Sequence, residues 1–143
     1  MNPECIFCKI ADGREPAHIV FEDEISVAFL DMRPVYHGHT LLIPKQHIST
    51  VMEFPGEFIE RFFLNLKLVS RAVEEGMGCQ GIFNAINNRI SQSVPHLHIH
   101  ILPRNKGDGM RHFLWPRGCY DTIDEAIATA EKIRLSVRRI RER

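Results

Sequence analysis

The sequence has no apolar run near the roughly 20 residues that a membrane-spanning helix needs, so we expect no transmembrane segment. Its first residues also lack the basic start and apolar stretch of a secretion signal, and we expect a cytoplasmic protein. Net charge is absent as well, because 18 Lys and Arg residues balance 18 Asp and Glu residues. This balance argues against a whole-protein electrostatic attraction to nucleic acid or to an anionic membrane.

Internal repeats, low-complexity tracts and linkers are absent, and the 143 residues include only 4 cysteines. In a reducing compartment so few cysteines do not form a disulfide framework. Hydrophobic residues make up 44% of the chain and charged residues 25%, close to the globular average, so disorder is not expected. We therefore expect one domain over residues 1–143, long enough to bury a core of its own.

The hydrophobic pattern predicts five short strands. Two of them are separated by an acidic turn, which suggests a hairpin, and the predicted ranges are 18–21, 26–30, 39–44, 81–86 and 96–102. Strands in neighbouring hairpins, with long helices inserted and appended, favour an α+β fold with an antiparallel sheet.

Two main helices are predicted from apolar stripes at three- and four-residue spacing. The first begins near Pro55, and two glycines, Gly76 and Gly78, are expected to stop it. The second begins at a capping box formed by Thr122 and Glu125 and continues to about residue 140.

Three histidines alternate with apolar residues over residues 96–102, which read His-Leu-His-Ile-His-Ile-Leu. Alternate residues of a strand share one face, so the pattern places His96, His98 and His100 together and directs the apolar residues into a core. Imidazole titrates near neutral pH and serves as nucleophile, proton carrier or metal ligand. The alternative is an exposed strand face that happens to use histidine, but three alternating copies argue against chance.

A polar loop, residues 87–93, comes directly before the histidine-lined strand. Its amides, hydroxyls and single guanidinium are the kinds of donor that phosphoryl oxygens accept. Polar loops are common, but beside these histidines the loop favours phosphate binding over a site made of metal alone.

These segments together resemble the histidine triad (HIT) superfamily of nucleotide hydrolases and transferases. Residues 96–102 are similar to the family's signature of three alternating histidines, and further similar segments follow in the expected order at residues 5–10, 28–31, 38–47 and 92–94. The resemblance covers roughly residues 4–104, while the C-terminal loop and helix at 105–143 carry much less of it. It implies an α+β fold of five antiparallel strands and two main helices, usually as a homodimer.

The resemblance implies cleavage at the α-phosphorus of a purine nucleoside 5′-phosphoryl compound, through a nucleotidyl-histidine intermediate. His98 matches the nucleophile, His100 the neighbouring histidine that contacts the phosphate, and His39 the buried histidine that orients both. Ser93 matches a polar group beside the phosphates. A neutral imidazole at position 98 has a lone pair free to attack only if its other nitrogen is fixed by a hydrogen bond.

The resemblance also implies a nucleotide-binding set. Asp31 matches the acidic residue that holds the ribose hydroxyls, and Asn87 and Gln92 match groups around the phosphates and leaving group. The apolar walls of the nucleobase cleft correspond to Phe7, Ile10, Phe29 and Met32, which could equally be core residues. Dinucleoside polyphosphates and nucleoside phosphoramidates are the candidate substrates.

Cys5 and Cys8 form a C-x-x-C pair near the N-terminus. No thioredoxin-like strand precedes the pair, which argues against a redox motif. A zinc site needs two further ligands, and His47 and His96 would complete a tetrahedral Cys2His2 set. Members of the family with this N-terminal pair bind structural zinc through matching residues. Two reduced, partly buried thiols are the alternative, and no organic cofactor is expected.

One segment departs from the family pattern. Many members carry a longer, glycine-containing loop between the residues that match Asn87 and Gln92, whereas residues 88–91 here are fewer and contain no glycine. Glycine allows close backbone approach to phosphate, so the number of phosphates accommodated stays open, with Arg89 as a candidate substitute contact.

Two other functions remain open on the sequence. One is a zinc-stabilised nucleotide-binding or scaffold protein with little turnover, against which the intact His98 argues. The other is nucleic-acid binding through the arginines near the C-terminus, but a basic run of this kind more often forms a solvated helix face.

A homodimer would cover the edges of the sheet, and Trp115 is expected at its interface or at the partner's nucleotide site.

Overall fold

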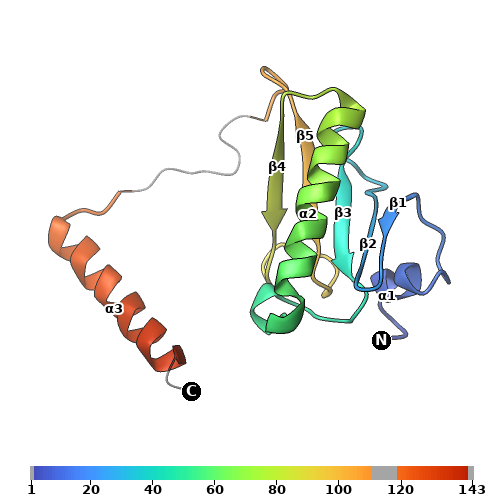
Figure 1. The fold of residues 1–143 in the computed structure, drawn as a ribbon. Coiled ribbons are helices and arrows are strands. Elements are labelled where there is room, and N and C mark those ends of the chain that lie inside the picture. Colours follow the sequence, from blue (N-terminus) through green and yellow to red (C-terminus); the bar gives the residue numbers. More distant parts are fainter. Residues whose placement is uncertain (1, 111–118, 142–143) are drawn as a thin grey trace. The chain divides into compact units, whose positions relative to one another are not determined.

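The computed structural model describes residues 2–110 and 119–141. The chain separates into two compact units, Met1–Asp108 and Gly109–Arg143. The first unit contains all five strands of the sheet, and the single domain expected over residues 1–143 stays a prediction. Its elements (Figure 1) are α1 (Ile6–Ala11), β1 (Ile19–Glu22), β2 (Ser26–Leu30), β3 (Thr40–Pro44), the 3-10 helix η1 (Val51–Glu53), α2 (Gly56–Met77), β4 (Gly81–Ile86) and β5 (Ile99–Arg104).

The five strands form one antiparallel sheet in the order β1-β2-β3-β5-β4, which confirms the predicted α+β fold. The central pairing of β3 with β5 sets Thr40 opposite Ile101 and Leu41 opposite His100. This register brings the residue that precedes β3, His39, beside the histidine of β5.

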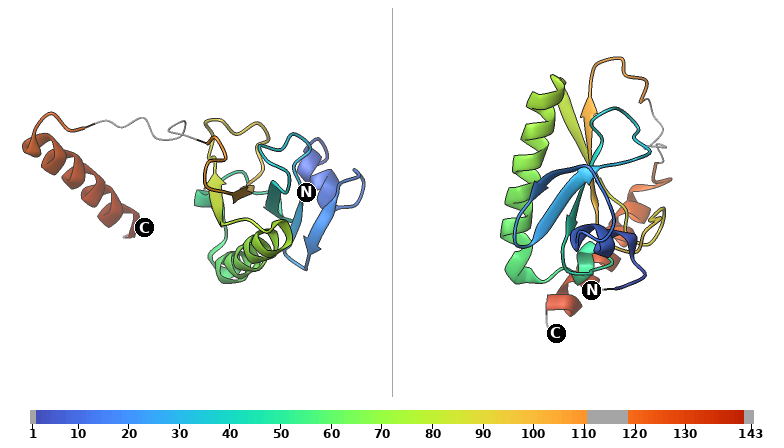
Figure 2. Two further views of the ribbon diagram at one scale, coloured as in Figure 1. Left: turned by 90° about the horizontal axis from the view of Figure 1, so that it is seen from above. Right: turned by 90° about the vertical axis from the view of Figure 1, so that its right-hand side faces the viewer.

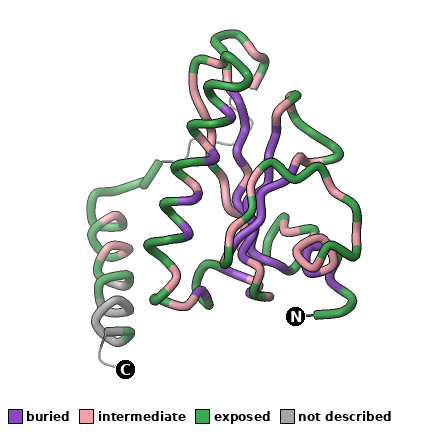
Figure 3. Tube along the Cα trace, turned by 45° about the vertical axis from the view of Figure 1, so that its right-hand side comes forward, coloured by how far each residue is buried: buried purple, intermediate pink, exposed green. Residues whose placement is uncertain are grey.

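Helices lie against both faces of the sheet, α2 on one face and α1 on the other (Figure 2). The side chains of each strand alternate between these two faces. On one face α2 packs Phe62, Val69 and Val73 into a core cluster with Leu42, Ile99 and Ile101. On the other face Phe7 and Cys8 of α1, together with its N-cap residue Cys5, pack against β2 and β3. The strand residues in this cluster are Val27, Phe29, Leu41 and Ile43. The buried residues therefore follow the central strands, and the outer side of α2 is exposed (Figure 3).

The predicted strands and main helices are present, with corrections at their ends. The fifth strand was predicted over residues 96–102 but extends over Ile99–Arg104. Residues 96–98 do not join the ladder: Leu97 N donates to Ile48 O instead, and pairing with β3 begins at Ile99. Gly76 lies inside α2, and Gly78 ends the helix in the left-handed region, with φ 61°.

The helix α1 was not predicted. It has six residues, which is too short for a hydrophobic period to be recognised. Its N-cap residue, Cys5, makes no side-chain capping hydrogen bond, so the usual N-terminal signal is missing as well.

The second unit contains α3 (Ile123–Arg141), which begins at the predicted capping residues. Thr122 Oγ1 accepts from Glu125 N at 3.1 Å, and the Glu125 carboxylate accepts from Asp121 N at 2.9 Å, one residue before the position expected in a capping box. Trp115 lies outside the described residues. Within residues 2–110 and 119–141, no helix is both long and apolar enough to cross a membrane.

Candidate functional site

A cleft of about 470 Å³ opens on the α1 face of the sheet. Its walls come from α1, from β2 and the loop after it, from β3, and from the segment that enters β5. Eight of the residues predicted from sequence line it: Phe7, Ile10, Phe29, Asp31, Met32, Ser93, His98 and His100. The structure therefore gathers an apolar set, one carboxylate, one hydroxyl and two imidazoles around a single space.

The His98 side chain has one defined tautomer. Its Nδ1 lies 2.7 Å from the carbonyl oxygen of His96, and a carbonyl only accepts, so Nδ1 carries the proton. The lone pair is consequently on Nε2. This is the arrangement that the sequence analysis required for nucleophilic attack by His98.

His100 and His39 form a second imidazole pair beside His98. The backbone N–H of Val35 donates to His39 Nδ1 at 3.3 Å, so the proton of His39 is on Nε2, which donates to His100 Nδ1 at 2.9 Å. His100 therefore keeps its own proton on Nε2, as a donor. The ring centroids of His98 and His100 are 4.9 Å apart.

Burial keeps this second pair neutral. Desolvation lowers the pKa of His100 to about 4, and it also lowers the pKa of the buried His39. The Asp31 carboxylate lies 3.6 Å from His39 Nδ1, near enough to oppose that lowering. His39 faces Asp31 with one ring nitrogen and His100 with the other, so these three residues form a chain rather than a chelating site for one metal ion.

Two predicted site residues brace the loop instead of lining the cleft. Gln92 Nε2 donates to Ser49 O at 2.6 Å, and its Oε1 accepts from Arg89 N at 2.8 Å. Asn87 Nδ2 donates to Ser91 O at 3.3 Å. Their contacts with phosphate therefore stay a prediction. Arg89 and Ser91 have φ of 70° and 58°, left-handed conformations that glycine adopts without strain.

The four residues of the predicted metal site converge. The Nδ1 of His96 lies 3.4 Å from Cys5 Sγ and 3.6 Å from Cys8 Sγ, and the Nδ1 of His47 lies 3.3 Å from Cys8 Sγ. All four ligand atoms lie within 4.8 Å of one another. Tetrahedral zinc with ordinary bond lengths separates its nitrogen and sulfur ligands by about 3.3–3.8 Å, so the spacing fits that ion.

The protonation of His96 also suits a metal ligand. Its Nε2 donates to Pro44 O at 2.8 Å, which leaves a lone pair on the Nδ1 that faces the thiols. Burial lowers the pKa of His96 to about 4, which keeps the ring neutral, and burial raises the pKa of the Cys8 thiol. A buried thiol of this kind needs a cation beside it to ionise, and a divalent metal would supply that charge.

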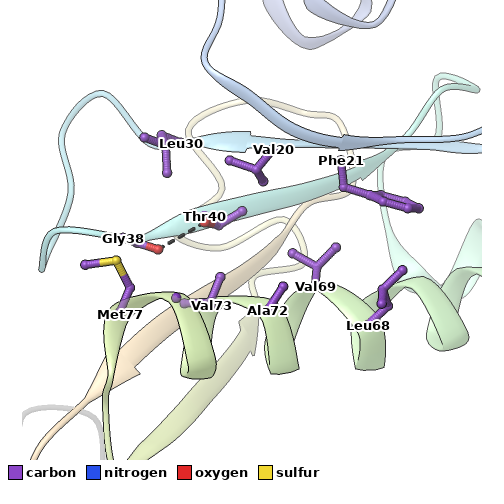
Figure 4. Close-up of a pocket in the computed structure, with 11 residues that line it drawn as sticks. Val20, Phe21, Leu30, Gly38, Thr40, Leu68, Val69, Ala72, Val73 and Met77 are labelled. Atoms are coloured by element: carbon purple, nitrogen blue, oxygen red, sulfur yellow. Dashed lines mark hydrogen bonds between the residues drawn. The ribbon is translucent and has the colours of Figure 1, made fainter.

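A second concavity lies on the other face of the sheet, between α2 and the strands β1, β2 and β3 (Figure 4). It has a volume of about 390 Å³ and an almost wholly apolar lining that includes Val20, Leu68 and Met77. Its lining contains no acid, base or nucleophile, and the Thr40 hydroxyl donates to Gly38 O. The reactive groups belong to the cleft on the α1 face.

Sequence reasoning missed several residues of the cleft. Arg33 brings a cation to its lining, two residues after Asp31, and its backbone N–H donates to Asp31 Oδ1 at 2.8 Å. An Asp-Met-Arg run directly after a strand was the available signal. The other unpredicted lining residues are Ile6, Pro16, Ala17, Leu30, Leu41 and Val94. Ile6 lies in the family-like segment 5–10, but Pro16 and Ala17 had no such signal, because the chain after α1 was not predicted.

Comparison with known proteins agrees with this geometry. Residues 12–107 match the HIT domain. The protein hit of Bacillus subtilis (strain 168) is 46% identical over 109 residues, which cover 73% of this chain and 74% of that protein. The crystal structure of a HIT-family member from Bacillus subtilis covers 91% of this chain and 94% of its own, at 37% identity and a TM-score of 0.76.

Two relatives have names that state an activity. Adenylylsulfatase HINT3 of Arabidopsis thaliana is 36% identical over 110 residues, covering 76% of this chain and 56% of that protein. Adenosine 5′-monophosphoramidase HNT1 of Saccharomyces cerevisiae (strain ATCC 204508 / S288c) is 30% identical over 119 residues, covering 81% and 72%. With the domain match, the overall similarity and the histidines assembled in one cleft, the chain belongs to the HIT family.

Proposed function

We propose that this protein is a nucleotide hydrolase or nucleotidyl transferase that cleaves its substrate at the α-phosphorus and releases a purine nucleoside monophosphate. The observation that carries the proposal is the His98 tautomer: Nδ1–H donates to His96 O, and a lone pair is left on Nε2 of a residue that lines the cleft. Membership of a family that includes nucleotide hydrolases supports the same reading.

In the proposed mechanism His98 Nε2 attacks the α-phosphorus, the bond to the leaving group breaks, and the nucleotidyl group is carried on His98. The imidazole then bears positive charge, which its Nδ1–H hydrogen bond to His96 O stabilises. Water subsequently attacks the same phosphorus and gives up a proton to the solvent, and His98 leaves with its Nε2 lone pair restored. Each displacement needs donors on the equatorial oxygens, a role for His100 Nε2–H and the Ser93 hydroxyl.

The same cleft suits the nucleoside part of the substrate. Its apolar residues form walls of the kind that pack on a flat base, and Phe7 and Phe29 already make an edge-to-face pair with centroids 5.5 Å apart. Asp31, at the other side, offers a carboxylate to the ribose hydroxyls. Adenylyl sulfate and adenosine 5′-phosphoramidate are the substrate types that the two named relatives suggest, and both join a small leaving group to the α-phosphorus.

Zinc is the ion proposed for the cluster of Cys5, Cys8, His47 and His96. Two thiolates and two neutral imidazoles at tetrahedral spacing favour zinc over the harder cations, which prefer oxygen ligands. With all four positions taken by protein atoms, the metal would be structural, as the sequence analysis expected.

A symmetric homodimer is also proposed. The sheet leaves β4 at one edge, with pairing recorded only to β5 among the described strands. An unpaired edge is protected when a second copy covers it across a two-fold axis. Light scattering at micromolar concentration tests this, and the mass of a single chain would contradict it.

Release of AMP from a fluorogenic adenosine 5′-phosphoramidate tests the proposed hydrolysis. The wild-type protein should turn over many equivalents, and a His98→Ala variant should not. A scaffold protein with little turnover, the alternative from the sequence, would bind AMP and release none from the phosphoramidate. That result with folded wild-type protein would overturn the proposed enzyme function.

A further inference from the structure

The N-terminal segment, residues 2–16, is attached to the rest of the described structure through side chains. Its backbone hydrogen bonds with described residues stay inside the segment, as from Cys5 N to Asn2 O and from Arg14 N to Lys9 O. The first backbone link to the sheet, from Leu30 N to His18 O, comes after the segment has ended. No strand ladder therefore holds α1 in place.

The polar attachments of this segment, among described residues, run through its two cysteines to His47 and His96. Its other attachments are apolar contacts of α1 side chains with β2 and β3 and the ring contacts of Phe7 with His96 and His98. An isolated helix of six residues is not stable in water, because nucleation costs more than a single turn returns. The Cys–His cluster is thus placed where a bound metal would fix the helix.

The same helix forms one wall of the cleft, through Ile6, Phe7 and Ile10. Phe7 lies between Cys5 and Cys8, and its ring contacts the rings of Phe29, His96 and His98 with centroids 5.5, 5.9 and 5.3 Å apart. A displacement of α1 would therefore remove the aromatic wall from the cleft.

The reacting imidazoles are also held by hydrogen bonds in which α1 takes no part. The Nδ1–H of His98 is fixed by the carbonyl of His96, and the His96 ring is itself held by Pro44 O. His39 and His100 come from the start of β3 and from β5. Displacement of α1 would leave these hydrogen bonds in place.

We propose that occupancy of the Cys5–Cys8–His47–His96 cluster by a divalent metal controls how tightly the cleft binds a nucleotide, by holding α1 and its Phe7 wall against the sheet. The proposal rests on the proposed function for the identity of the ligand. It predicts that metal removal raises KM much more than it lowers kcat.

Calorimetric titration with AMP tests the proposal on three samples of the full chain: zinc-loaded, stripped with a chelator, and refilled with zinc. Stripping should weaken AMP binding by about tenfold or more, which corresponds to loss of one stacking wall, and refilling should restore it. Hydrogen exchange on the same samples should show lost protection at residues 5–11 and unchanged protection at residues 40–44.

Two variants test whether the change in AMP affinity comes from the Cys–His cluster or from another thiol of the chain. Cys5→Ser should reproduce the weak AMP binding of stripped protein even in excess zinc. Cys79→Ser removes a half-buried thiol whose recorded hydrogen bonds are to Glu74 O and Gly81 O, and it should bind AMP like the wild type.

Equal AMP affinity of the loaded and stripped protein, within twofold, would overturn the proposal. So would loss of protection at residues 40–44 on stripping, because the metal would then support the whole sheet rather than α1. A zinc-loaded protein that binds no AMP would instead refute the proposed function, and the exchange at residues 5–11 would still test whether the metal holds the helix.

Discussion

His98 donates its Nδ1 proton to the carbonyl oxygen of His96 at 2.7 Å, so one backbone group sets the tautomer of the side chain that faces the cleft. This hydrogen bond connects two histidines whose rings have different surroundings. The His96 ring faces two cysteines, its carbonyl holds His98, and His98 keeps a lone pair on Nε2. The proposed metal ligand and the proposed nucleophile are therefore two residues apart in the chain.

Replacing His98 with Ala should lower kcat by about 10³-fold or more, because no other lone pair in the cleft occupies its position. AMP binding should change little, since the base and ribose contacts remain. Intact-protein mass measurement after rapid quenching should show a nucleotide adduct on wild-type protein that maps to residue 98. An adduct on another residue would refute the mechanism.

Replacing His39 with Phe should lower kcat by about tenfold to a hundredfold, with a small effect on KM. The change removes the Nε2–H that holds His100 Nδ1, so His100 loses its fixed tautomer as a donor. Steady-state kinetics on a phosphoramidate measures the effect. His37→Phe, at an exposed position two residues away, is the matched control and should retain wild-type kinetics.

Replacing Cys5 with Ala should lower the melting temperature by about 5 °C or more, because it removes one of the four ligands of the proposed structural metal. Metal analysis of protein purified without chelator should give close to one zinc per chain for wild type and much less for the variant. Wild-type protein with under a tenth of an equivalent after reconstitution would contradict the zinc assignment.

Stability should fall with acid through His100, a half-buried residue of the cleft. Its pKa is lowered from 6.5 to about 4 in the folded protein, so the unfolded chain binds more protons between these two pH values. The free energy of unfolding therefore decreases as pH falls from 6.5 to 4, by at most about 1.4 kcal/mol per pH unit from this group. Denaturant titrations at several pH values should show a shallower slope for His100→Gln. An unchanged slope would contradict the assignment.

The alternation of histidine with apolar residues was sufficient to predict which residues of 96–102 face the core, because the period of an extended chain is fixed by its backbone. Leu97, Ile99 and Ile101 are buried against α2 as expected. The long helix α2 was equally easy to predict from the sequence, since its apolar stripe repeats over many turns. Local sequence was a weaker guide at the ends, where His96 and His98 lie outside the ladder.

Tertiary structure decided which residues share the cleft and how their protons are placed. The approach of Asp31 and His39 to His100 depends on the β3–β5 register, a pairing between segments about 60 residues apart that no local pattern encodes. The tautomer of His98 depends on the direction of the His96 carbonyl. The helix α1 has too few residues to be predicted from hydrophobic periodicity. The sequence by itself determined the chemical groups and the strand faces, because these follow from residue type and backbone period. Only the fold decided that Gln92 holds the loop to Ser49, that Arg33 reaches the cleft, and that Phe7 both lines the cleft and contacts His96 of the Cys–His cluster, because these depend on long-range contacts.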